Sequence, residues 1–152
     1  MSLGADDRFA IQDLYASQFW ALDTGDVEAY VGTFTADAVL EMAERHEGRD
    51  AIRRFAIAFR AGDPWLLGSQ HAISQLRVEG DGVRATVRAY VQRFHRLPGW
   101  NRNNSSVVWV GHYDDVLRKQ DGTWRFERQF AKAWEGSIQQ RVADARPAKR
   151  LP

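Results

Sequence analysis

Apolar side chains recur every three or four residues in the first part of the chain, which is the spacing of one face of an α-helix. Over residues 5–24 this face consists of Ile11, Leu14, Tyr15, Gln18 and Leu22. Gly25 follows, and glycine readily takes the left-handed conformation that closes a helix. The pattern therefore predicts a first helix over residues 5–24.

Two more helices and a short strand are expected next. Asp26 is suited to cap a second helix that runs through about Phe34, because its carboxylate can accept a backbone N–H of the first turn. Residues 37–42 have the pattern of a short strand. Asp50 has the capping position of a third helix over residues 50–62.

The period changes to two after residue 70, as in β-strands. Pairs of alternating stretches surround residues 80–82 and residues 120–122, whose glycines and aspartates are typical of hairpin turns. The polar residues 97–106 separate the two hairpins. We therefore expect an α+β fold in which a curved antiparallel sheet packs against three N-terminal helices.

Composition narrows the class of protein. The chain has 152 residues, 44% of them apolar, which suits one domain, and we place it at residues 5–135. Residues 136–152 are polar, basic and broken by proline, so we expect a loosely held tail. Basic and acidic residues nearly balance, at 21 against 20, which argues against nucleic acid as a partner.

Several kinds of site and location are not expected. The chain has no cysteine, which excludes disulfides and thiolate chemistry. No two histidines have the spacing of metal ligands on one helix or strand, so we expect no metal and no other cofactor. No apolar run reaches the ~20 residues of a membrane span, and the first residues lack the pattern of a signal peptide. We expect a cytoplasmic protein that binds no membrane.

Asp23 and His71 are the candidates for chemistry. Asp23 lies in the last turn of the first helix, where a carboxylate faces the negative end of the helix dipole. His71 opens the first long strand, and alternation places residues 71, 73 and 75 on one face. Each has an ordinary alternative: a solvated turn aspartate, and a histidine satisfied at a strand end. Their separation along the chain leaves open whether they meet.

The order of these elements resembles the nuclear transport factor 2-like superfamily and, within it, the SnoaL-like proteins. The resemblance is carried by AIQDLYASQFWALDTGD, FTADAVL, EGRDAI, QHAISQLRVEGDGVRA and GHYDDVLRKQDGTWRFERQ, and it covers roughly residues 5–135. It implies that the curved sheet is cone-shaped. This fold hosts dehydratases, isomerases, cyclases, hydrolases and non-catalytic modules, so the resemblance implies no single function.

The resemblance gives Asp23 and His71 a joint role. In the scytalone dehydratase and hexachlorocyclohexane dehydrochlorinase families, an Asp that ends the first helix pairs with a His that opens the first long strand, and these positions fall on Asp23 and His71. The implied chemistry is proton abstraction by an imidazole that the carboxylate orients. The expected function is therefore that of a cofactor-independent lyase, similar to a dehydratase, or isomerase acting on a small hydrophobic, cyclic, oxygenated molecule.

The departures from these families limit the expected reaction. Gln18 and Gln129 stand where the dehydrochlorinase has a Lys and an Arg that face the pocket, so loss of halide is not expected. The two tyrosines and the second histidine of scytalone dehydratase fall near Leu22, Met42 and Arg93. The base is thus retained, while the groups that assist the leaving group in either family are not.

We predict further pocket residues in two ways: from alternation along the strands, and from the face of the first helix that also carries Asp23. Tyr113 could donate a hydrogen bond to a substrate oxygen, or be a half-buried core tyrosine. Arg93 could hold an anionic group if it points inward, or reach solvent. The predicted substrate-binding residues are Tyr15, Gln18, Phe19, Arg93, Trp109, Tyr113 and Gln129.

Two other functions remain open. The same fold serves as the small subunit of ring-hydroxylating dioxygenases and as ligand-binding modules, in which Asp23 and His71 would have a structural role. Epoxide or polyketide ring chemistry would instead give Asp23 the leading role. The outer sheet face carries a mixture of arginines and aromatics that is typical of subunit interfaces, so we expect a homodimer or homotrimer. This mixture includes Arg84, Arg88, Tyr90, Gln92, His112, Asp114, Arg128 and Phe130.

Overall fold

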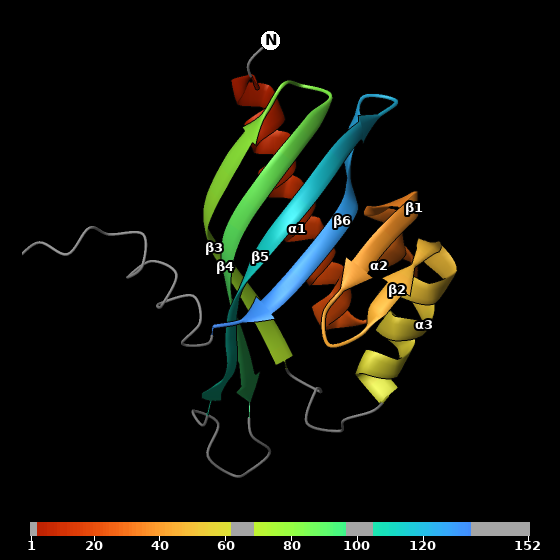
Figure 1. Ribbon diagram of the computed structural model, residues 1–152. Helices are drawn as coiled ribbons and strands as arrows, with labels where there is room; N and C mark the ends of the chain where they lie inside the picture. Colours follow the sequence, from red (N-terminus) through yellow and green to blue (C-terminus); the bar gives the residue numbers. More distant parts are fainter. Residues whose placement is uncertain (1–2, 62–68, 97–104, 135–152) are drawn as a thin grey trace, which may run out of the picture.

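The computed structural model describes residues 3–61, 69–96 and 105–134. Its elements are α1 (Ala5–Thr24), α2 (Val27–Gly32), β1 (Phe34–Glu41), β2 (Arg45–Glu47), α3 (Gly48–Ala61), β3 (Ser69–Gly80), β4 (Arg84–Arg96), β5 (Ser105–Gln120) and β6 (Thr123–Ala133). The strands form one six-stranded sheet in the order β2-β1-β6-β5-β4-β3. Figure 1 shows a curved sheet with α1 along one face and α2 and α3 beside β1 and β2. The predicted α+β fold is confirmed.

Local signals placed the first helices well. Helix α1 has the predicted bounds, and Gly25 closes it with a left-handed φ of 84°. Asp26 caps α2 by accepting the Ala29 N–H at 3.0 Å. The prediction that this helix reaches Phe34 is wrong, because Phe34 begins β1 and pairs with Phe126 of β6 in a parallel register. Tertiary pairing therefore overrides the local helical pattern at this point.

The beginning of the third helix and the strand before it also differ from the sequence prediction. Helix α3 begins at Gly48, so Asp50 lies in its first turn instead of capping it. Strand β2 precedes α3 and pairs with β1. Its three residues are too few to produce a recognisable alternating pattern in the sequence. Of the predicted loop, residues 97–106, the last two begin β5, and the others lie outside the described residues, as does the predicted tail, 136–152. None of the helices within the described ranges is long and apolar enough to cross a membrane.

Strand β3 contains a β-bulge that the alternation rule did not anticipate. The register with β4 shifts between Ser74 and Arg77, and Gln75 has a positive φ of 55°. A bulge inserts one residue and reverses the faces beyond it. His71 and Ile73 therefore share the inner face as predicted, but Gln75 is exposed, and Leu76 takes the inward position. The prediction for residue 75 was wrong for this reason.

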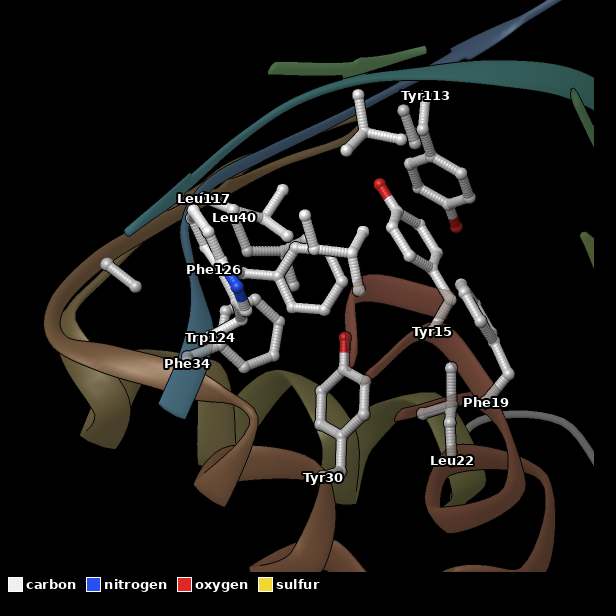
Figure 2. Close-up of a cluster of buried hydrophobic side chains, with 14 of the residues drawn as sticks. Tyr15, Phe19, Leu22, Tyr30, Phe34, Leu40, Tyr113, Leu117, Trp124 and Phe126 are labelled. Carbon is white, nitrogen blue, oxygen red and sulfur yellow. The ribbon is translucent and has the colours of Figure 1, made fainter. Parts of the chain in front are cut away.

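The core lies between α1 and the inner face of the sheet. Phe126 of β6 is completely buried at its centre and packs edge-to-face on Tyr15, with 5.0 Å between ring centroids. Phe34 contacts the same ring at 5.6 Å. Figure 2 shows these rings gathered between the helices and the sheet. The inward positions of β4 carry small side chains, Ala85, Val87, Ala89 and Val91, all buried.

The outer sheet face carries most of the charges and aromatics predicted for it. Arg88 pairs with Asp114 across β4 and β5 at 2.7 Å. His112 lies on this face as predicted, paired with Tyr90 in the register, and is buried there beside Trp134. The homodimer or homotrimer predicted from this face stays a prediction.

Candidate functional site

Asp23 and His71 meet where the end of α1 crosses the beginning of β3. The His71 Nδ1 lies 2.6 Å from Asp23 Oδ1, and the His71 backbone N–H donates to Asp23 Oδ2 at 2.8 Å. The His71 side chain is only 7% exposed and the Asp23 side chain only 15%. One carboxylate oxygen thus contacts the imidazole ring and the other the His71 backbone. Together they fix the position of the strand and the orientation of the ring.

Arg60 compensates for a carboxylate at the negative end of a helix. Its Nη1 donates to the backbone carbonyl of Asp23 at 3.3 Å. The same guanidinium lies directly over Gly25, where any Cβ would meet it at 2.2 Å. Gly25 therefore serves two purposes, because it closes α1 and leaves space for a cation beside the pair.

Aromatic rings surround the imidazole. Phe19 of α1 and Phe59 of α3 have ring centroids 5.2 and 6.2 Å from that of His71. Phe19 also contacts Tyr113 at 5.7 Å. No described residue makes a hydrogen bond with the second ring nitrogen of His71, Nε2. Phe59 was not among the predicted site residues, because helical periodicity does not indicate which strand a helix face contacts.

Four of the predicted site residues line one cavity of about 980 Å³: His71, Arg93, Trp109 and Tyr113. The strand register explains this, since His71 pairs with Arg93 and Arg93 with Trp109 across three neighbouring strands. Met42, Phe55 and Phe59 supply apolar walls. This volume and lining suit a small ring compound.

A second hollow of about 730 Å³ lies between α1 and β3, and His71 borders both cavities. Tyr15, Phe19 and Asp23 line this second hollow and not the larger cavity. The predicted binding residues are therefore divided between the two sides of the imidazole.

The structure places Gln18 and Gln129 in the core, outside the lining of either cavity. They are 0% and 2% exposed, and each side-chain amide donates to the other's oxygen, at 3.0 and 2.9 Å. Two neutral amides satisfy one another when buried, which a charged pair of the same sign could not do. These contacts place both residues in core packing, and their substrate-binding role stays a prediction that this geometry does not favour.

Tyr113 lies in the wall of the larger cavity. Burial raises the pKa of its hydroxyl well above the ordinary value, so the group is neutral and can donate a hydrogen bond. It makes no hydrogen bond with any described residue, whereas the Tyr15 hydroxyl is engaged in the core. Figure 2 shows the two hydroxyls pointing in different directions.

Asp115 is a buried acid to which sequence reasoning assigned no role. It accepts hydrogen bonds from the Tyr15 hydroxyl at 2.5 Å and from the Phe130 N–H at 3.0 Å, with the Gln129 amide at 3.4 Å. Burial raises its pKa from 3.8 to about 7 and outweighs these bonds. The available signal was a carboxylate at an inward strand position between Tyr113 and Leu117.

Asp115 should make the stability of the fold depend on pH. Its folded pKa is about 7 against 3.8 for the ordinary group, so the folded chain retains a proton that the unfolded chain has lost between these values. The free energy of unfolding should therefore fall by about 2 kcal/mol as pH rises from 5 to 7. Urea unfolding at several pH values should show this decrease in the parent but not in Asp115→Asn. Asp114→Asn, the outward neighbour, is the control, and a slope retained in Asp115→Asn would contradict the assignment.

Within the three described ranges, His, Asp and Glu side chains form no group of three or more that could hold a metal ion. The site is therefore described by its imidazole, its carboxylate and the two cavities that meet at the ring.

Comparison with known proteins identifies the family. The model of the SnoaL-like domain family matches residues 4–129. No curated protein sequence matches the chain significantly. Rv3472 of Mycobacterium tuberculosis, a protein of unknown function solved in a variant form, is 27% identical, with 86% of this chain and 77% of that chain covered and a TM-score of 0.76.

Two structures from Novosphingobium aromaticivorans share the fold. An NTF2-like protein with a cystatin-like fold is 24% identical, with 90% and 88% coverage of this chain and that chain and a TM-score of 0.77. A protein whose name proposes a scytalone dehydratase is 22% identical, with 85% coverage of both chains and a TM-score of 0.72. The sheet has the architecture of these proteins, including the NTF2-like one. Since the family model spans most of the sequence, the chain belongs to the SnoaL-like domain family.

Proposed function

We propose that this protein is a cofactor-independent lyase or isomerase in which His71 removes a proton from a hydrophobic, cyclic, oxygenated substrate. The observation that carries the proposal is the buried contact of 2.6 Å between His71 Nδ1 and Asp23 Oδ1 at the edge of a cavity. A carboxylate in this position favours the tautomer with a proton on Nδ1 and stabilises the imidazolium that forms later.

The opposite ring nitrogen is the proposed base. Nδ1 contacts Asp23, which lines only the smaller hollow, whereas His71 borders both cavities. We therefore assign Nε2, on the opposite side of the ring, to the larger cavity. With the proton on Nδ1, Nε2 carries the lone pair that accepts a proton from substrate carbon or oxygen. Phe19 and Phe59 keep water away from the imidazole and hold its plane.

Tyr113 is the proposed hydrogen-bond donor to the substrate. Its neutral hydroxyl can polarise a carbonyl and stabilise the negative charge that develops on that oxygen when the proton leaves. The imidazolium can then return the proton. Transfer to a departing hydroxyl gives dehydration, and transfer to another carbon gives a shifted double bond. Trp109 provides a flat wall for the ring of the substrate.

The structural neighbours support the reaction class only through the fold. The Novosphingobium protein named for scytalone dehydration shares the architecture at 22% identity. A module that only binds a ligand could share it equally. What favours an enzyme is that His71, oriented by Asp23, borders both cavities while its Nε2 makes no hydrogen bond with a described residue, which leaves this nitrogen available to a bound compound.

Isotope exchange tests proton abstraction without knowledge of the natural substrate. A panel of cyclic hydroxy-ketones incubated with the protein in D₂O should include compounds whose α-proton NMR signals disappear faster than in buffer. His71→Gln, purified identically, should not accelerate this loss. Exchange that is equally fast with the parent, the variant and no protein would overturn the proposal, and so would exchange that is unchanged in the variant.

A further inference from the structure

Two arginines differ from all the others whose side chains the structure describes. The others donate hydrogen bonds to carboxylates or backbone carbonyls, as Arg53 does to Glu28 and Arg84 does to Glu127. Within the described ranges, Arg54 and Arg93 have no such partner, and both line the larger cavity. The unmatched guanidinium groups are therefore concentrated at the proposed site.

Arg93 lies beside the proposed base. It is paired with His71 on one side and with Trp109 on the other in the strand register, so the three side chains share one row of the inner face. Its guanidinium carbon lies 5.6 Å from the centre of the Phe59 ring, and its Nε is buried without a hydrogen-bond partner. Arg93 is only partly buried, but its sealed Nε has no partner among the described residues, which is unfavourable, and a single aromatic face compensates only in part.

The other charges of this cavity do not neutralise Arg93. Arg45 is already paired with Glu47 at 2.7 Å and with Glu41 at 3.7 Å. Glu44 is the acidic side chain among the described lining residues, and the cations besides Arg45 are Arg54, Arg93 and Lys132. The cavity is thus cationic in a chain whose charges otherwise nearly balance.

We propose that the larger cavity binds a cyclic carboxylate, with the carboxylate group on Arg93 and the ring between Phe59 and Trp109. A planar guanidinium matches a carboxylate through two parallel hydrogen bonds, and the apolar walls suit the ring. Arg54, which is exposed on α3, attracts the anion to the mouth. This inference rests on the proposed function only in placing the bound compound beside His71, and it specifies the substrate class as anionic.

Calorimetric titration with benzoate and the neutral benzamide tests the inference on the full chain. The parent should bind benzoate at least about tenfold more tightly than benzamide. Arg93→Gln should lose that preference, and Arg93→Lys, which keeps the charge but not the planar pair of donors, should retain part of it. Arg88→Gln is the matched control, because it removes the same charge from the outer face of the same strand.

The outcomes separate this inference from the proposed function. Equal affinity for benzamide, no measurable benzoate binding, or an unchanged preference in Arg93→Gln would overturn carboxylate binding. If Arg93→Gln does not fold, Arg93→Lys with a preference equal to that of the parent would overturn it instead. Arg88→Gln should bind benzoate as the parent does, because Arg88 lies on the outer face and pairs with Asp114. Proton exchange that persists in His71→Gln would contradict only the role of His71 as the base. A preference for benzoate over benzamide that persists in Arg93→Gln would contradict only the anion site.

Discussion

Asp23→Asn should lower turnover of any substrate found by isotope exchange about 10²–10⁴-fold while leaving its affinity nearly unchanged. The amide oxygen of Asn can still accept the His71 backbone N–H. Its NH₂ would then face Nδ1 and donate to it, which places the ring proton on Nε2. The nitrogen directed toward the cavity would become a donor and could no longer remove a proton.

His71→Gln should cause a loss of similar size, because the base itself is removed. Asp13→Asn, on the exposed side of the same helix, is the matched control and should keep the activity of the parent. Single-turnover rates and substrate affinities measured separately would distinguish a chemical defect from weaker binding. Normal rates in Asp23→Asn would exclude orientation of the imidazole by this carboxylate.

Phe126→Ala should reduce the free energy of unfolding by about 3–5 kcal/mol. The ring is completely buried and packs on both Tyr15 and Phe34, so its removal leaves a cavity between α1 and the sheet. Tyr15 also donates to Asp115, and a shift of its ring would weaken that hydrogen bond. Urea denaturation followed by tryptophan fluorescence would measure the loss.

Phe9→Ala provides the matched control, because Phe9 is 66% exposed and should contribute almost nothing. If both substitutions changed stability equally, Phe126 would not lie at the centre of the core between α1 and the sheet. A loss smaller than about 3 kcal/mol in Phe126→Ala alone would instead mean that neighbouring side chains move into the space.

The helices were the most predictable part because their signals are local. The 5–24 pattern, Gly25 as the closing residue and Asp26 as a cap all concern hydrogen bonds within a few residues. The predictions that depended on distant partners were less accurate. Phe34 lies in a strand because it pairs with β6. Gln75 lies on the opposite face from the predicted one because a bulge shifts the register between β3 and β4.

The candidate site shows the same division. Alternation indicated that Arg93, Trp109 and Tyr113 share a face, and the structure places all three in one cavity. Alternation could not distinguish an inward residue that lines a cavity from one that is sealed in the core. Gln18 and Gln129 face inward as expected but satisfy each other there, and their amide contact joins residues of α1 and β6.

The sequence by itself determined the order of the helices and long strands and, except in β3 beyond its bulge, the face that each presents to the interior, because periodicity and caps act over short distances. It also carried the resemblance to the SnoaL-like proteins. Only the tertiary structure decided that Asp23 contacts His71, that Arg93 has no acidic partner among the described residues, and that the buried Asp115 accepts a hydrogen bond from Tyr15. These contacts join segments far apart in the chain, and their geometry depends on how the curved sheet packs over α1 and α3.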